Sequence, residues 1–392
     1  MSIPFPSRTA IAAALGCAGL LLVGWTGLLV PSLVRSIEPA FDQTDAGVGV
    51  FFFVNAVAYV GGSMLGGLLT ERVGRRVVLP LAVTLIALGL AGMATVPTWG
   101  LFLVLAIPFG FGSGAIDGGM NGLVLDLYPE SRGRALNLLH LFFSLGALAS
   151  PLVVGRLVEA GAGWESVILG TALAAIPIAV LFVVVPLPSG RHARSDGAAS
   201  VRVGLSLPII ALAVAIACYV ASEVGVSNWL VRFLETASLG LATSTLALFW
   251  GCLALGRIVT AVLGDRFDHA RFAATASVVA AIALVAAVVV PSLPASIVLF
   301  GVVGFAFGPV YPLIMAVAGD LYPARSAAVS GFLSGSAVIG AILYPPLMGF
   351  ISVEAGLSVA MIGAAILAFA CAAVLFAVGR RSTRLSPVAS SR

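Results

Sequence analysis

Four ionisable side chains lie within stretches of the sequence that are otherwise apolar: Asp117, His140, Glu223 and Arg257. A charge at the centre of a bilayer costs at least about 2.5–3.5 kcal/mol, so such side chains usually face a cavity or a partner. Two carboxyl groups, an imidazole and a guanidinium can exchange protons and bind a polar solute. The sequence has no nucleophile with an adjacent base, no metal-ligand spacing and no nucleotide-binding loop, so neither an enzyme nor a cofactor is expected.

Asp117 lies in a glycine-rich stretch, and Asn121, four residues later, shares its helix face. Apolar surroundings disfavour the charged form of a carboxyl group, so Asp117 is a candidate site for the coupling proton and for the solute. His140 follows in the next apolar stretch, and imidazole titrates closest to physiological pH. We expect His140 to bind the solute and to exchange protons with Asp117. The alternative for each residue is a structural hydrogen bond, to a neighbouring helix or to a carbonyl.

The second half of the chain offers Glu223 as a further proton-coupling and solute-binding candidate, with Asn228 and Trp229 about one turn later. Trp229 alternatively belongs to an interfacial aromatic belt. Arg257 is expected to bind an anionic solute, or to pair with Glu223 or Asp117. Tyr311 is a further solute-binding candidate. Lesser candidates, for which packing or interfacial placement is at least an equal alternative, are Trp25, Asn55, Asn137, Tyr219 and Tyr344.

These residues must be held by membrane-spanning helices. The 392-residue chain is 60% hydrophobic and 9% charged, with a mean hydropathy of +1.15. Spans of about 20 apolar residues are the length that a bilayer requires, and only helices satisfy their own backbone there. An all-α integral membrane protein is therefore predicted, with twelve spans: 11–33, 46–70, 77–96, 99–127, 134–158, 164–186, 206–230, 243–264, 271–291, 295–320, 326–351 and 357–379.

Charge predicts the orientation. All twenty basic residues are arginine, and sixteen of them lie at the termini or in the even-numbered connections between spans. Basic residues are enriched in cytoplasmic loops, so both termini are expected in the cytoplasm. The same bias accounts for the net charge of +4, which is no indication of nucleic-acid binding. The composition suggests a bacterial inner membrane as the location.

The two halves of the chain match at a constant offset of 194 residues. Asp126-Leu-Tyr-Pro returns as Asp320-Leu-Tyr-Pro, and Gly110 and Gly114 return as Gly304 and Gly308. Such glycine pairs are expected at close helix contacts. We predict an N-terminal six-helix bundle over 1–186, a cytoplasmic linker over 187–204 and a C-terminal six-helix bundle over 205–392. Internal repeats of this kind are typical of transporters with a central binding site.

The connection between the second and third spans reads Gly67-Leu-Leu-Thr-Glu71-Arg72-Val-Gly-Arg75-Arg76. This resembles the signature loop of the major facilitator superfamily, Gly-x-x-x-Asp-Arg-x-Gly-Arg-Arg/Lys. The second copy keeps Asp265-Arg266. We expect Gly67 to let helices approach closely, and acids and arginines to form an ion-pair latch in each half. The latch residues are predicted to be Gly67, Glu71, Arg72, Arg75, Arg76, Asp126, Asp265, Arg266 and Asp320.

Residues 110–151 contain Asp117-Gly-Gly-Met-Asn121 and Leu136-Asn-Leu-Leu-His140, followed by a Phe and a Gly-Ala pair. These resemble the L-fucose:proton symporters of the superfamily, in which a glutamate precedes an asparagine by four residues. On that resemblance, Asp117 takes the place of the proton-linked glutamate and His140 that of a sugar-facing glutamine. The stretch from Tyr219 to Trp229 resembles a Tyr-x-x-x-Glu-x-Gly-x-x-x-Trp pattern of sugar-permease-like relatives.

Three functions remain open from sequence. The first is a transporter that imports a small polar solute, sugar-like in view of the fucose resemblance, with protons as the coupling ion and alternating access as the mechanism. The second is a proton-driven exporter of drugs or metabolites. The third is a sensor or scaffold on the same fold. The expected partners are a small-molecule substrate and the lipid bilayer, and a monomer is the expected state.

Overall fold

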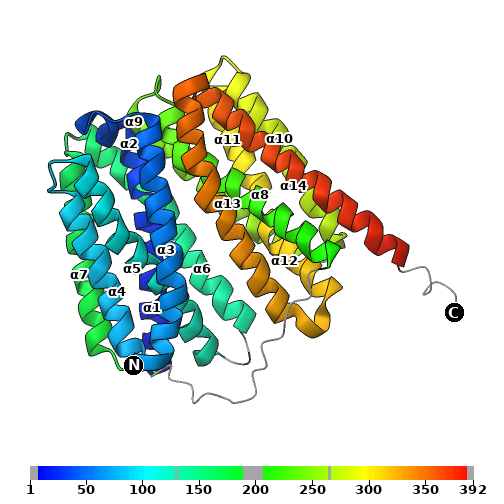
Figure 1. The fold of residues 1–392 in the computed structure, drawn as a ribbon, viewed down its shortest axis with the longest axis horizontal. Helices are drawn as coiled ribbons and strands as arrows, with labels where there is room; N and C mark the ends of the chain where they lie inside the picture. Colours follow the sequence, from blue (N-terminus) through cyan, green and yellow to red (C-terminus); the bar gives the residue numbers. More distant parts are fainter. Residues whose placement is uncertain (1–7, 129, 131, 189–205, 264–265, 386–392) are drawn as a thin grey trace, which may run out of the picture. The chain divides into compact units, whose positions relative to one another are not determined.

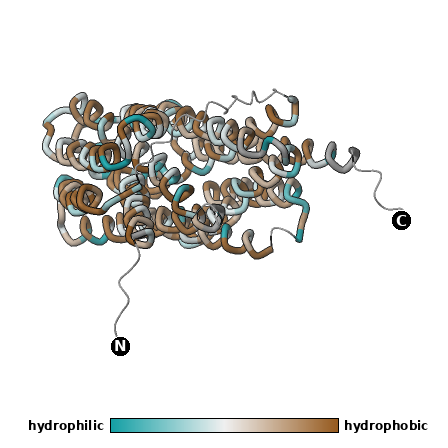
Figure 2. Tube along the Cα trace, turned by 90° about the horizontal axis from the view of Figure 1, so that it is seen from below, coloured by the Kyte–Doolittle hydropathy of each residue, from teal (hydrophilic) through white to brown (hydrophobic). Residues whose placement is uncertain are grey.

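The structure, a computed structural model, describes residues 8–128, 130, 132–188, 206–263 and 266–385. Within these ranges the secondary structure is helical, and twelve stretches are long and apolar enough to cross a membrane, as predicted. Apolar residues cover most of each helix, with short hydrophilic stretches between them (Figure 2). The expected linker 187–204 lies outside the described residues from position 189 onward.

The helices of the first half are α1 Arg8–Gly27, α2 Leu29–Ala40, α3 Asp45–Val73, α4 Arg75–Met93, α5 Trp99–Leu127, α6 Arg132–Glu159 and α7 Trp164–Val184. Those of the second half are α8 Leu207–Phe233, α9 Leu239–Leu263, α10 His269–Val289, α11 Leu293–Phe307, α12 Val310–Leu321, a short 3₁₀ helix Pro323–Arg325, α13 Ser326–Ala355 and α14 Leu357–Leu385.

Two expected spans, 11–33 and 295–320, each form two consecutive helices rather than one. α1 ends at Gly27 and α2 begins at Leu29, and α11 ends at Phe307 and α12 begins at Val310. A proline lies close to each break, Pro31 in the first and Pro309 in the second. Proline has no N–H to donate to the carbonyl four residues earlier, so the helical hydrogen bonds are interrupted there. Pro309 keeps helical dihedral angles, φ −64° and ψ −30°. The break there therefore interrupts the helical hydrogen bonds more than it changes the direction of the chain.

The chain divides into two compact units (Figure 1). Unit 1 comprises Met1–Asp196 and Ser238–Ala247, and unit 2 comprises Gly197–Ala237 and Leu248–Arg392. The start of α9 therefore groups with unit 1, although the sequence repeat assigns it to the second half. The backbone N–H of Gly240 donates to Glu159 Oε1 at the end of α6, over 2.8 Å.

In unit 1, glycines bring α5 into backbone contact with α3. A Cβ on Gly110 would lie 2.6 Å from the Asn55 carbonyl oxygen, and one on Gly114 would overlap the Tyr59 carbonyl oxygen. A Cβ on Gly118 would meet the Ser63 carbonyl oxygen at 2.9 Å. No larger residue fits at this spacing, so the glycines fix the distance between the two helices, as is common in membranes. The prediction of close packing at Gly110 and Gly114 is confirmed.

Unit 2 repeats this contact between α11 and α9. A Cβ on Gly304 would overlap the Phe249 carbonyl oxygen, and one on Gly308 would overlap the Leu253 carbonyl oxygen and lie 2.8 Å from Arg257 N. These partners are the residues 194 positions after Asn55, Tyr59 and Ser63. The repeat therefore preserves the packing while the side chains at the contact differ between the two units.

Replacing Gly114 with alanine is expected to destabilise the protein by about 1–3 kcal/mol, because the added methyl group forces α3 and α5 apart. The matched control is Gly100→Ala on the same helix, where a Cβ meets nothing within 4 Å. An alanine there is expected to be neutral or slightly stabilising, because alanine favours the helix by about 1 kcal/mol. The apparent Tm of both variants in detergent checks this. Equal Tm values would contradict the described backbone contact.

Candidate functional site

A polar group in unit 1, here called the Asp117 cluster, consists of Tyr59, Asp117, Asn121 and His140. Asn121 Nδ2 donates to Asp117 Oδ1 over 3.4 Å, and the Tyr59 hydroxyl also hydrogen-bonds to the Asp117 carboxylate. His140 is close enough for its charge to act on Asp117. The structure thus brings together the three residues predicted for the first half, from α5 and α6, and adds one from α3.

Tyr59 is the member that the sequence prediction missed. Asn55, Tyr59 and Ser63 recur at intervals of four on α3, which places them on one helix face. That face packs on Gly110, Gly114 and Gly118 of α5. This recurrence of polar side chains every four residues, in an otherwise apolar span, was the sequence signal that could have identified Tyr59. Only the packing of α3 on α5 shows that Tyr59 reaches Asp117.

Two buried amides on α3 and α5 retain unused hydrogen-bonding capacity. Asn121 Oδ1 and Asn55 Nδ2 are both buried and have no hydrogen-bond partner among the described residues. A buried polar atom without a partner costs about 1–3 kcal/mol. Asn121 Oδ1, beside the Asp117 carboxylate, suits a ligand that carries a donor, as a hydroxyl group does.

Unit 2 holds a second polar group, the Arg257 cluster, made of Tyr219 and Glu223 on α8 and Arg257 on α9. Arg257 Nη2 lies 3.7 Å from Glu223 Oε1, so of the pairings considered from sequence the structure has Arg257 with Glu223. The Tyr219 hydroxyl lies within reach of both charged groups, yet it has no hydrogen bond of ordinary geometry with any described atom. The carboxylate and the guanidinium neutralise each other inside an apolar helix pair.

The other residues predicted in the second half are placed differently. Trp229 is fully buried, and its Nε1 donates to the Pro345 carbonyl oxygen over 2.8 Å, so its described contacts belong to packing within unit 2. The Tyr311 hydroxyl lies 3.2 Å from Ser334 Oγ, and its ring centroid is 6.4 Å from that of Tyr219. Asn228 is half-buried near the end of α8. Solute contact by these three residues stays a prediction.

The expected latch of unit 1 contains an ion pair between Arg75 and Asp126. Arg75 Nη2 lies 2.6 Å from Asp126 Oδ2, and the arginine side chain is only 4% exposed. Glu71, Arg72 and Arg76 have exposed side chains. The expectation for Gly67 is wrong for the described residues, since a Cβ there would meet nothing within 4 Å. The close approach occurs instead at Gly62 and Gly66, which pack on Phe111 and Ala115 of α5.

The latch of unit 2 uses a residue that was not predicted. His269 Nδ1 lies 2.8 Å from Asp320 Oδ2. These two residues are 194 positions after Arg75 and Asp126, so histidine takes the place of arginine in the second copy. Arg266, predicted as the partner, is exposed, and Asp265 lies outside the described residues. The repeat offset, applied to Arg75, was the signal that identifies His269.

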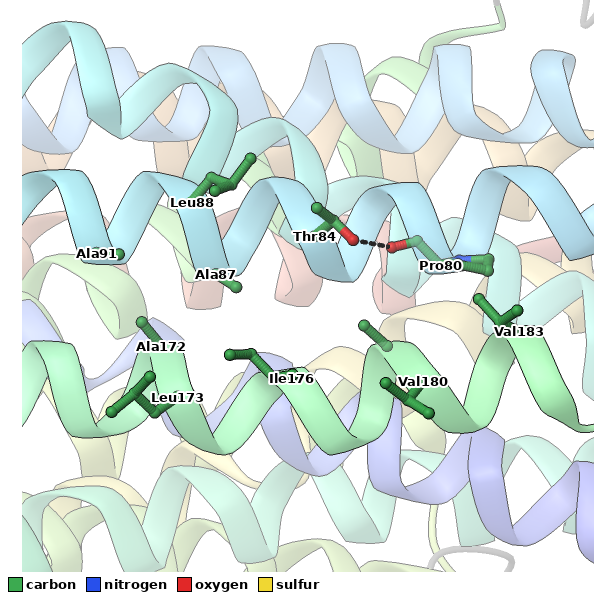
Figure 3. A pocket seen from close by; sticks show the side chains of 11 residues that line it. Pro80, Thr84, Ala87, Leu88, Ala91, Ala172, Leu173, Ile176, Val180 and Val183 are labelled. Carbon is green, nitrogen blue, oxygen red and sulfur yellow. Dashed lines mark hydrogen bonds between the residues drawn. The ribbon is translucent and has the colours of Figure 1, made fainter.

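A groove between α4 and α7 has no lining residue in common with either cluster (Figure 3). It is lined by alanine, leucine, isoleucine and valine side chains, together with Pro80 and Thr84. The Thr84 hydroxyl already donates to the Pro80 carbonyl oxygen over 2.8 Å, as the dashed line in Figure 3 shows. A groove with so little polar capacity does not suit a polar solute, so each cluster remains a candidate site in its own unit.

Comparison with known proteins identifies the family. The model of the Major Facilitator Superfamily matches residues 14–260 and 210–391. The gentisate transporter of Corynebacterium glutamicum is 26% identical over 84% of this chain and 80% of its own length. The sodium-dependent glucose transporter 1 of Danio rerio is 28% identical over 35% of this chain, and the match spans only 23% of that relative's length.

Solved structures share the fold over nearly the whole chain. A bacterial homolog of the human lysosomal transporter Spinster matches with a TM-score of 0.80 at 14% identity, over 97% of this chain and 99% of the other. A D-xylose–proton symporter matches with a TM-score of 0.75 at 16% identity, over 94% and 98% of the two chains. At these identities the similarity establishes the helical architecture alone.

Replacing Asp126 with asparagine is expected to destabilise the protein more than replacing Asp320 with asparagine. The first change leaves the buried Arg75 guanidinium without its counter-charge, a loss of about 1.5–3 kcal/mol for a hydrogen bond to a charged group. Asp320 is 65% exposed, and such pairs contribute about 0–1 kcal/mol. Apparent Tm values in detergent at neutral pH compare the two variants. A larger loss for Asp320→Asn would show that burial does not set the strength of the two latches.

Proposed function

The chain belongs to the Major Facilitator Superfamily, and we propose that it is a secondary active transporter that carries a small polar solute, a sugar or sugar-like molecule, together with a proton. The observation that carries this proposal is the Asp117 cluster. A carboxylate, a phenol, an amide and an imidazole converge inside membrane-spanning helices. Ionisable groups at such depth usually serve a transport pathway or a proton relay.

The chemistry of the cluster links proton and solute. An ionised Asp117 only accepts hydrogen bonds, and Tyr59 and Asn121 supply two donors to it. When Asp117 takes up a proton, it becomes a donor as well, and the donors of Tyr59 and Asn121 are released for another acceptor. A hydroxyl of the solute offers both an acceptor and a donor to the protonated cluster. Protonation therefore favours solute binding, and by reciprocity the solute favours protonation. In this proposal His140 exchanges the proton with Asp117.

The named relatives agree with a solute of this class. One is called a sodium-dependent glucose transporter and one a gentisate transporter, and both solutes carry hydroxyl groups. The name of the first makes sodium the alternative coupling ion. Alternating access, with cytoplasmic termini in a bacterial inner membrane and a monomeric state, completes the proposal. The Arg75–Asp126 and His269–Asp320 pairs would act as conformational latches in it.

Uptake into proteoliposomes tests the proposal. Purified protein is reconstituted, an inward proton gradient is imposed in sodium-free buffer, and labelled monosaccharides, polyols, sugar acids and gentisate are supplied one at a time. We expect one of these solutes to accumulate, and an uncoupler to abolish the accumulation. Accumulation that requires sodium would show that sodium, and not the proton, is the coupling ion. Proton-driven movement of hydrophobic drugs in the opposite direction, with no uptake of polar solutes, would favour the exporter.

Asp117→Asn is expected to abolish uphill accumulation, so that the ratio of internal to external solute falls to about one, because coupling requires a group that takes up and releases the proton. Exchange of labelled for unlabelled solute across the membrane should persist, since asparagine still offers a donor and an acceptor. Accumulation by this variant at the wild-type level would exclude Asp117 as the coupling residue.

Tyr59→Phe is expected to weaken solute binding by several-fold up to about tenfold, because in the protonated cluster the Tyr59 hydroxyl donates to a neutral solute hydroxyl, and such a hydrogen bond contributes about 0.5–1.5 kcal/mol. Tyr128→Phe, at the end of α5, is the matched control and should bind as the wild type does. Titration calorimetry with the solute found in the uptake assay measures both affinities. Unchanged binding by Tyr59→Phe would leave that hydroxyl outside the site.

A further inference from the structure

The guanidinium of Arg257 has more hydrogen-bonding capacity than its described partners use. Its Nη2 is 3.7 Å from Glu223 Oε1, whereas a charge-assisted N–H···O bond measures about 2.7–2.9 Å. Arg75 and Asp126 in unit 1, at 2.6 Å, illustrate the tighter form. Arginine carries five donors in one plane, in a geometry that matches a carboxylate. Arg257 is therefore loosely paired and can bind a second carboxylate.

The neighbouring hydroxyl also lacks a partner. Tyr219 is fully buried, and its hydroxyl has no hydrogen bond of ordinary geometry with a described atom, although Glu223 and Arg257 are both within reach. The two charged side chains differ in access, since Arg257 is 34% exposed and Glu223 is 8% exposed. A ligand that enters this cluster therefore meets the cation first, with a free hydroxyl beside it.

The fold does not require a cation at this position. The backbone of Arg257 packs on Gly308, just as the backbone of Ser63 packs on Gly114 in unit 1. The same helix contact is thus made with a serine in one unit and an arginine in the other. Because the packing uses only the backbone of Arg257, its side chain is available to bind a charged group.

We propose that the Arg257 cluster binds a carboxylate group of the transported solute, and that Glu223 takes up a proton as the solute's carboxylate replaces it on Arg257. The inference rests on the proposed function and narrows the solute to an organic acid, such as a sugar acid. One O–H bond forms on Glu223, and no other covalent bond changes. The cluster holds one cation and one anion before and after the exchange, so its net charge stays at zero.

Charge balance makes the two events depend on each other. A carboxylate that arrives without a proton leaves a net negative charge in an apolar helix pair. A proton that arrives without the carboxylate leaves Arg257 with no counter-charge. An unpaired charge in such surroundings is strongly disfavoured. Each ligand therefore favours the binding of the other, which is the thermodynamic requirement for symport.

The surroundings of Glu223 offer no other described group that would balance the charge. Arg257 and Tyr219 act on it directly. The helices packed against α8 contribute hydroxyl and thiol groups that already have partners: Tyr311 with Ser334, Tyr344 with the Ala360 carbonyl oxygen, and Cys371 with Ser277. The solute itself must then supply the anion when Glu223 is protonated.

Titration calorimetry on the full-length purified protein tests this with matched probes. The pairs are D-glucuronate with D-glucose and D-gluconate with D-glucitol, which differ by a carboxylate in place of a hydroxymethyl group. We expect the acid of at least one pair to bind about tenfold or more tightly than its neutral partner. Titrations in two buffers of different ionisation enthalpy count all protons taken up on binding, including any at Asp117, and we expect the wild type to take up about one proton more per acid bound than Glu223→Gln does.

Two variants separate the role of Glu223 in proton uptake from that of Arg257 in carboxylate binding. Glu223→Gln mimics the protonated state, so it should still bind the acid while the proton count falls by about one. Arg257→Gln should weaken acid binding about tenfold or more. Because Arg257→Gln alone leaves a buried carboxylate unpaired and is at risk of misfolding, the double variant Arg257→Gln with Glu223→Gln removes both charges together. It should fold and still bind the acid weakly.

Several results would overturn the inference. They are the absence of binding by any acid, equal binding of the neutral partners, wild-type acid affinity in the double variant, or an unchanged proton count in Glu223→Gln. A wrong carboxylate assignment is distinguishable from a wrong proposed function. Proton-driven uptake of a neutral solute that Asp117→Asn abolishes would keep the proposed function and reject the carboxylate.

Discussion

The contact between the backbones of α3 and α5 is the constraint on which the site in unit 1 depends. Gly110, Gly114 and Gly118 let α5 approach α3 so closely that a methyl group at any of them would collide with main-chain atoms. In lipid, helices gain little from hydrophobic association and hold together through such close packing. The same contact places Tyr59 against Asp117. The geometry of the polar cluster follows from residues that have no side chain.

The repeat preserves the glycine contact between helices but places different side chains beside it. Gly304 and Gly308 make the equivalent contact in unit 2, with Phe249 and Leu253 where unit 1 has Asn55 and Tyr59. Ser63 corresponds to Arg257, and Asp117 to Tyr311. One unit therefore presents an acid with hydrogen-bond donors around it, while the other presents a paired acid and base. Two similar packing solutions thus carry two different sets of polar side chains.

The two latches differ in the same way. Arg75 carries a permanent charge, is almost fully buried and holds Asp126 tightly. His269 is charged only when protonated, and it holds an exposed aspartate at the equivalent place. Breaking the buried pair costs more free energy than breaking the exposed one.

The sequence alone determined the membrane class, the twelve spans and the repeat, because apolar length and a constant offset are properties of the chain. It also identified Asp117, His140, Glu223 and Arg257, because charges inside apolar spans stand out whatever their partners. Partners depend on distances between helices, which periodicity does not contain. Tertiary structure therefore decided that Tyr59 approaches Asp117, that Arg257 pairs with Glu223, and that His269 and not Arg266 meets Asp320. It also showed that the close contact on α3 occurs at Gly62 and Gly66, which face backbone atoms of α5. The predicted Gly67 faces open space.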